Sequence, residues 1–155
     1  MKISSQDEYG LRIILRIAQA DKDLGLSIPQ LSEQEGLSEP YVGKLTRTLR
    51  LAGLIQSNRG HKGGYVLAKP ADKIKINEIL EALGGKLFDT KFCGSHSGVG
   101  RLCTNSVDCS VRSLWKMVQF TLDNLLEKVT LSDLMNTESA SNEQLKKILL
   151  AGHTI

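Results

Sequence analysis

The sequence predicts a mainly α-helical protein, a winged helix-turn-helix with a long C-terminal dimerisation helix. Three observations lead to this prediction. Two short amphipathic segments flank a glycine at residue 36, as in a helix-turn-helix. A glycine-rich turn between two short apolar runs follows them, as in a β-hairpin wing. Beyond residue 110, apolar residues recur at three- and four-residue steps over nearly twenty residues, as in a long helix.

Composition narrows the class of protein. The chain has 155 residues, of which 41% are hydrophobic and 24% charged, with a net charge of +3, as in an ordinary globular protein. Its apolar runs are too short for a membrane span and its N-terminus lacks the pattern of an export signal, so we expect a cytoplasmic protein with no membrane partner. No nucleophile, base and orienting group converge, so we expect no enzyme.

The first expected helix runs from Ser5 to about Ala20. Ser5 is the expected N-cap, and Glu8 follows three residues later, as in a capping box. Apolar residues occupy most of the circumference of this helix, which predicts burial by more than one neighbour. These residues are Tyr9, Leu11, Ile13, Ile14, Leu15, Ile17 and Ala18.

The second and third expected helices form the helix-turn-helix. The second begins after Ser27, which pairs with Gln30 in another capping pattern, and ends at Gly36. The third begins at Ser38 and is broken by Gly53. Helical spacing predicts that the third helix buries Tyr41 or Val42, Leu45, Leu49 and Ala52.

The wing is expected from two strands, residues 54–57 and 65–68, joined by a glycine-rich turn and ended by Pro70. Between Pro40 and Lys69 the chain has six basic residues and no Asp or Glu. The six are Lys44, Arg47, Arg50, Arg59, Lys62 and Lys69. Since Lys and Arg displace counterions from phosphates, this segment is expected to bind double-stranded DNA.

The expected DNA contacts divide by position. The start of the third helix should meet base edges through Ser38, Glu39, Pro40, Tyr41 and Lys44. Phosphates are expected to meet Arg47, Thr48 and Arg50, further along this helix. The wing tip carries Arg59, His61 and Lys62. Of these, Arg59 is the candidate for insertion into a narrow minor groove. The alternative for each residue is an exposed side chain without a fixed contact.

The second half of the chain begins with a short helix from about Ile76 to Leu83, closed by two glycines. The long apolar pattern that follows later comprises Val111, Leu114, Trp115, Val118, Leu122, Leu125, Leu126 and Val129. Packing against a second copy would bury it and match a palindromic operator. The alternative is a helix packed only on its own domain. A further helix is expected at about residues 142–150.

These patterns divide the chain into four segments. We expect a DNA-binding domain at 1–70, a connecting helix with a cysteine loop at 71–110, a dimerisation helix region at 111–136 and a tail at 137–155.

All three cysteines lie in the loop. Nine residues separate Cys93 from Cys103, and five separate Cys103 from Cys109. An odd number of thiols in a reducing compartment disfavours a disulfide framework. Thiolates are the usual protein ligands of iron-sulfur clusters. Two alternatives remain open, a structural zinc site completed by His96 and a metal-free thiol redox switch.

Several of these motifs together resemble a known family. They are "DEYGLRIILRIA", "SEPYVGKLTRTLRLAGLIQSNRGHKGGYVLAKP", the three-cysteine loop, "LWKMV" and "TLSDLM", which span about residues 1–135. They resemble the Rrf-two family of bacterial iron-sulfur transcription regulators, which includes IscR, NsrR and RirA. The resemblance implies a homodimeric repressor or activator that senses cluster status, nitric oxide or redox state.

The resemblance also implies a ligand set. Cys93, Cys103 and Cys109 match the three cysteine ligands of the family, although the first gap is longer here. Arg112 stands where IscR-like members have a histidine ligand, and since Arg112 cannot be a ligand, the IscR-like ligand set is not expected. Gly43 stands where they have a base-reading glutamate, so a different operator is expected. In NsrR-like members an acidic residue of the other subunit completes the site.

The position that matches this acidic ligand is Glu8. The alternative for Glu8 is a capping role only, and Asp7 and His96 are the reserve ligands. A four-iron, four-sulfur cluster is favoured, and a two-iron, two-sulfur cluster is the second candidate.

Overall fold

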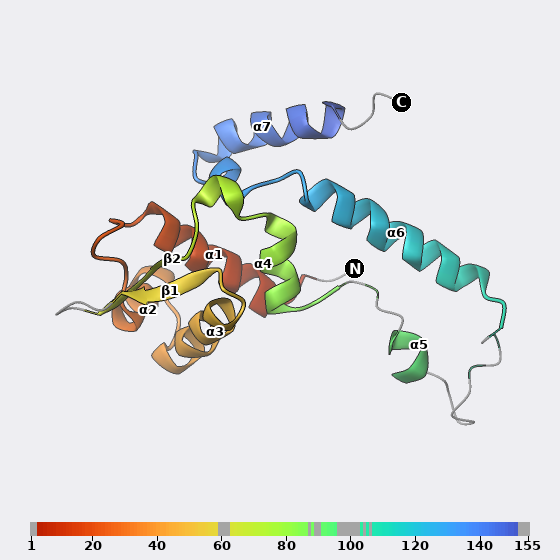
Figure 1. Ribbon diagram of the computed structural model, residues 1–155, viewed down its shortest axis with the longest axis horizontal. Helices are drawn as coiled ribbons and strands as arrows, with labels where there is room; N and C mark the ends of the chain where they lie inside the picture. The colour runs from red at the N-terminus through yellow and green to blue at the C-terminus, as the bar shows by residue number, and fades with distance from the viewer. Residues whose placement is uncertain are drawn as a thin grey trace.

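The computed structural model describes residues 3–58, 63–86, 88, 91–95, 103, 105 and 107–151. It is mainly helical with one two-stranded antiparallel sheet, which confirms the predicted fold class of a winged helix (Figure 1). Its elements are α1 (Ser5–Gln19), α2 (Ile28–Glu35), α3 (Glu39–Leu51), β1 (Ile55–Asn58), β2 (Gly64–Leu67), η1 (Ala71–Lys73), α4 (Ile76–Leu83), α5 (Lys91–Ser95), α6 (Ser110–Leu126), η2 (Leu131–Leu134) and α7 (Glu138–Ala151).

The N-terminal cap of α1 lies one residue earlier than expected. Ser4, not Ser5, is the N-cap, and its hydroxyl accepts the backbone N–H of Asp7 at 3.1 Å. The Asp7 carboxylate in turn accepts the backbone N–H of Ser4, which completes the capping box. The prediction that Glu8 closes this box is therefore wrong, because the box uses the shorter side chain of Asp7. The side chain of Glu8 is left exposed.

The helix-turn-helix forms as expected. Ser27 and Gln30 make the predicted capping box at the start of α2. Gly36 ends α2 in the left-handed conformation, with φ +66°, which glycine adopts without the steric cost of a Cβ. Helix α3 begins at Glu39, one residue after the expected start, and Ser38 is its N-cap, although the Ser38 side chain makes no capping hydrogen bond.

The hydrophobic core joins α1, α3 and α4. Ile13, Ile14 and Ile17 of α1 are buried in it with residues of the other two helices. From α3 it contains Val42, Leu45 and Leu49, and from α4 it contains Ile76, Ile79 and Leu83. Of the two alternatives offered for α3, Val42 is the buried residue and Tyr41 is half-buried. Ala52 was expected in the core but is exposed, because α3 ends before it.

The wing is an antiparallel hairpin. Ile55 pairs with Leu67 and Asn58 with Gly64, so each strand is shifted by one residue from its expected range. A second pair of backbone hydrogen bonds joins Tyr65 to Leu26, at 3.1 and 2.8 Å. The hairpin is thereby fixed to the connection between α1 and α2, so it lies beside α3 in a set position.

A close joint holds the start of α1 against the end of α4. The side chain of Gln6 donates to the carbonyl of Leu83. A Cβ at Gly10 would overlap the side chain of Leu83, so glycine lets the two helices approach. The expected bounds of α4 are confirmed. Gly85, which follows the C-cap Gly84, has the left-handed backbone conformation, with φ +81°.

The apolar pattern beyond residue 110 divides between two places. Val129 was expected on the apolar face of this helix, but α6 ends at Leu126. Val129 is instead buried in the core, where its carbonyl accepts the N–H of Ile76 at 3.0 Å. The N-terminal half of α6 extends away from the helical body on the side opposite the hairpin (Figure 1).

The C-terminal helix is longer than expected. Helix α7 begins at Glu138, four residues before the predicted start, and packs Leu145 and Ile148 against the core. The division of the chain into four functional segments stays a prediction.

Candidate functional site

The exposed side of α3 carries the residues predicted to bind DNA. Ser38, Pro40, Lys44, Arg47 and Arg50 are exposed, whereas Tyr41 and Thr48 are half-buried. Val42, Leu45 and Leu49 face the core, so helical periodicity directs the basic side chains outward. This arrangement leaves the cationic face of α3 open to a polyanion. The predicted wing-tip residues Arg59, His61 and Lys62 lie outside the described residues.

A buried carboxylate joins the second helix to the first. The side chain of Glu35 in α2 is 1% exposed and accepts from Arg12 Nε and Arg16 Nε of α1, each at 2.6 Å. Such charge-assisted hydrogen bonds are stronger than neutral ones. This triad was not among the predicted features. Its signal was two arginines four residues apart in residues 9–18, which otherwise carry no polar side chain except that of Tyr9; this spacing places both guanidinium groups on one face.

Aromatic contacts join α1 directly to the start of α3. The rings of Tyr9 and Tyr41 meet edge to face, with their centroids 6.1 Å apart. The guanidinium carbon of Arg12 lies 5.5 Å from the centroid of Tyr9. Tyr9 follows Glu8 in α1, and Tyr41 is one of the predicted base-reading residues. The N-terminal parts of α1 and of α3 are therefore in direct contact through these rings.

The three cysteines are free thiols, each half-buried. Cys93 was expected in a loop, but it lies on the short helix α5. Cys109 is the N-cap of α6, and its Sγ accepts the backbone N–H of Arg112 at 3.3 Å. Within the described part of the chain, no three His, Cys, Asp or Glu residues are gathered as metal ligands, and His96 falls outside that part. Three free thiols fit an iron-sulfur cluster by chemistry, but the single chain does not bring them together.

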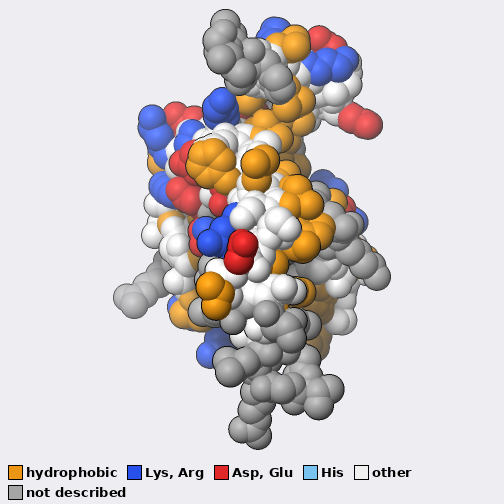
Figure 2. Space-filling model, turned by 90° about the vertical axis from the view of Figure 1, so that its right-hand side faces the viewer, with side chains coloured by type: hydrophobic (Ala, Val, Ile, Leu, Met, Phe, Trp, Pro, Cys, Tyr) orange, Lys and Arg blue, Asp and Glu red, His pale blue; other side chains and the backbone are white. Residues whose placement is uncertain are grey.

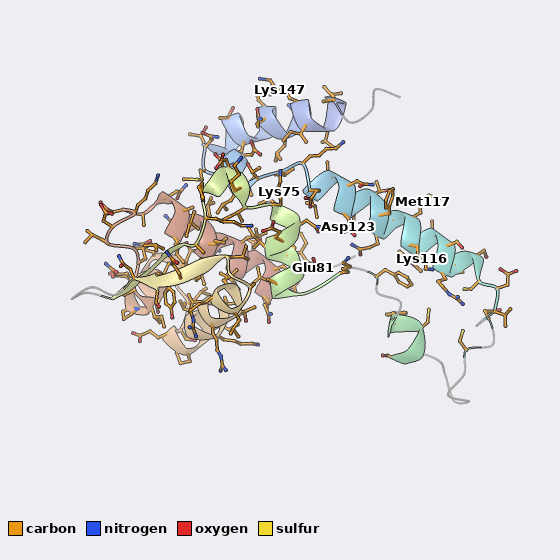
Figure 3. All side chains as sticks on the ribbon, viewed as in Figure 1. Lys75, Glu81, Lys116, Met117, Asp123 and Lys147 are labelled. Carbon is orange, nitrogen blue, oxygen red and sulfur yellow. The ribbon has the colours of Figure 1, made fainter. Side chains whose placement is uncertain are left out.

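A groove of about 520 Å³ lies between α1, α4 and α6, and Glu8 lines it. Its apolar wall consists of Ile3, Leu11, Leu80, Leu122 and Leu126. Its acidic side chains are Asp7, Glu8, Glu81 and Asp123, with Lys86 as the basic one. Lys86 Nζ lies 3.8 Å from both Glu81 and Asp123, which face one another from α4 and α6 (Figure 3). Asp7 is engaged in the capping box, so Glu8 is the freer carboxylate of the pair.

The outer half of α6 has an apolar side open to solvent. The exposed side chains include Leu114 at 54%, Trp115 at 44% and Phe120 at 66%. Figure 2 looks onto the side toward which α6 extends, and several hydrophobic side chains are open there. Exposed apolar patches of this kind are typical of protein interfaces. From Ser110 to Leu122 the charged residues are Arg112 and Lys116, both basic, so this half complements the acidic groove.

The comparison with known families confirms the resemblance. The family model described as Iron-dependent Transcriptional regulator matches residues 3–137. The chain belongs to the Rrf2 family. Protein rrf2 of Nitratidesulfovibrio vulgaris is 32% identical over 139 residues, which is 90% of each chain. The Rrf2 family consists of DNA-binding transcription regulators and not of enzymes. The predictions that the protein binds DNA and that it is not an enzyme are thereby confirmed.

Solved structures of Rrf2 regulators have the same fold. T. potens IscR is 31% identical with a TM-score of 0.66, over 87% of this chain and 86% of that one. CymR of B. subtilis, named the global cysteine regulator, is 29% identical with a TM-score of 0.67, over 87% and 96%. Among the described residues, no helix combines the length and the hydrophobicity that a membrane span requires.

Proposed function

We propose that this Rrf2 protein is a homodimeric transcription regulator that senses an iron-sulfur cluster held by Cys93, Cys103 and Cys109. The observation that carries the proposal is the grouping of three free thiols in one segment that ends at the N-cap of α6. Cysteines that bind a cluster must be free thiols. The segment also connects α4, at the end of the winged helix-turn-helix, to the exposed apolar helix α6. The protein would be located in the cytoplasm, where the bacterial DNA lies.

Dimerisation is proposed through α6. The exposed apolar side chains of its outer half match the apolar wall of the groove, and its two basic residues match the acidic rim. In a two-fold dimer the same two surfaces meet twice, once in each direction. Such a pair would present two copies of α3 to a palindromic operator.

The fourth ligand is proposed to be Glu8 of the second subunit. Its carboxylate is exposed in the groove that the partner helix would enter, and the capping box occupies Asp7 instead. When bound, the cluster supplies iron that reacts with oxidants or nitric oxide. Glu8 lies in the first turn of α1, next to Tyr9, whose ring contacts Tyr41 of α3, so a pull on Glu8 by the cluster would act on this contact. Coupling of about 1 to 3 kcal/mol would change operator affinity about five- to 150-fold.

DNA docking is proposed to use the residues predicted above. Ser38, Pro40, Tyr41 and Lys44 would meet base edges at the start of α3, and Arg47, Thr48 and Arg50 would meet phosphates. Arg59, His61 and Lys62 would act from the wing.

The deciding experiment is on protein purified without oxygen. A visible spectrum is recorded, and iron and acid-labile sulfide are counted per chain. About four irons support a cubane cluster with one ligand that is not cysteine, and about two irons support the smaller cluster. Zinc without sulfide would make the site structural. Neither metal nor sulfide would leave a thiol redox switch.

The role of Glu8 is tested by Glu8→Ala with Glu33→Ala as the matched control, because Glu33 is also an exposed glutamate on a helix but does not line the groove. The first variant is expected to lose its cluster faster in air, whereas the second keeps the wild-type lifetime. Equal lifetimes in the two variants and the wild type would remove Glu8 from the ligand set.

A further inference from the structure

Helix α6 also carries polar side chains that make hydrogen bonds within the subunit, besides the dimer contact proposed above. Arg112, Gln119 and Asp123 are half-buried, in contrast to the exposed apolar side chains of the same helix. We call these three residues the polar stripe. Arg112 and Gln119 are seven residues apart, so they lie on one face of the helix, separated by about 10 Å.

At one end, the polar stripe holds the chain that enters the cysteine segment. The backbone N–H of Phe88 donates to Gln119 Oε1 at 2.8 Å. Gln119 Nε2 donates to Asp123 Oδ1, also at 2.8 Å, so both ends of the carboxamide are engaged. The Phe88 side chain is 9% exposed, and its ring lies 6.1 Å from that of Phe92, the neighbour of Cys93.

At the other end, Arg112 contacts the chain around the last cysteine. The backbone N–H of Arg112 donates to Cys109 Sγ at 3.3 Å. Its guanidinium Nη2 donates to the carbonyl of Asn105 at 2.9 Å. Helix α6 therefore contacts the chain before Cys93, between Cys103 and Cys109, and at Cys109 itself.

We propose that Gln119 is a positioning residue that fixes the entrance of the cysteine segment to α6, the helix that begins after Cys109, and so limits how far Cys93 can move from Cys109. It binds no metal itself and acts through the Phe88 amide. The consequence for the cluster rests on the proposed function, but the effect on the Phe88 amide does not. A lost neutral hydrogen bond should raise local opening about five-fold.

The test compares Gln119→Met with Gln34→Met, the same change at an exposed position of α2. In the metal-free protein, hydrogen exchange of the Phe88 amide is measured by NMR, and dimer mass and melting temperature are recorded. Gln119→Met is expected to exchange about five-fold faster, with the control at the wild-type rate. The cluster of Gln119→Met is expected to be lost in air faster by a similar factor.

Rescue separates positioning from general destabilisation. The double variant Gln119→Glu with Asp123→Asn reverses the donor and the acceptor between the two side chains and keeps an acceptor for the Phe88 N–H. It should restore slow exchange. If Gln119→Met fails to fold, Asp123→Ala, which removes the acceptor that orients Gln119, is expected to raise the same exchange rate.

The outcomes are distinct. Faster exchange in Gln119→Met, together with a wild type that assembles no cluster, supports the positioning role and refutes the cluster proposal. Unchanged exchange at Phe88, or an equal rise in Gln34→Met, overturns the positioning role whether or not the wild type binds a cluster.

Discussion

Removing the two arginines of the buried triad should destabilise the protein more than removing the charge of Glu35. The Glu35 side chain is 1% exposed, whereas those of Arg12 and Arg16 are 44% and 48% exposed. Arg12→Gln with Arg16→Gln therefore leaves a buried carboxylate short of compensation, which costs about 3 to 5 kcal/mol. In Glu35→Gln the two guanidinium groups are solvated by water, and the amide oxygen of the new side chain remains as one acceptor. The free energy of unfolding is therefore expected to fall by about 2 kcal/mol.

The assay is unfolding by urea and by heat at one fixed protein concentration, because subunit association would make stability depend on concentration. For a chain of this length, about 1 kcal/mol lowers the melting temperature by about 2 to 4 °C. The arginine pair variant should then melt about 6 to 20 °C lower, and Glu35→Gln about 4 to 8 °C lower. Arg47→Gln with Arg50→Gln, an exposed pair on α3, is the matched control and should stay near the wild type. A larger loss in Glu35→Gln than in the arginine pair variant would refute the reasoning from burial.

Three further predictions concern packing, assembly and DNA. Gly10→Ala should lower the free energy of unfolding by about 1 to 3 kcal/mol in urea, because its Cβ would overlap Leu83; an unchanged value would refute the close joint. Trp115→Ala should weaken the dimer by about 2 kcal/mol, roughly thirty-fold in Kd by sedimentation, with Thr121→Ala as the control on the same helix; equal dimer constants would count against α6. Arg47→Ala should weaken operator binding in a gel-shift titration and reduce the salt slope by about 1, whereas a wild-type slope would show no phosphate contact.

Local rules account for much of what the sequence predicted correctly. The capping box at Ser27 and the left-handed glycine at Gly36 depend on neighbouring residues only, so both could be recognised from spacing. The bounds of α4 were recognised for the same reason. Where two local solutions competed, at Ser4 and Ser5, the prediction chose the wrong one, since both serines have an acidic residue three positions later.

The candidate site was predictable in its chemistry but not in its geometry. Residue types and order were enough to indicate a cationic recognition helix and a three-thiol segment. The contact of Tyr9 with Tyr41 and the groove around Glu8 join residues distant in the chain, and no local pattern reports them.

The sequence by itself determined the winged helix-turn-helix and the family, because helix caps, turns and hydrophobic periodicity act over a few residues. Only the tertiary structure decided that Val129 leaves the apolar face of α6 for the core. It also decided that Glu35 is the buried anchor of two arginines, and that α6 holds the cysteine segment through Gln119. These features depend on which elements pack together, and packing is settled by shape and burial across the whole chain.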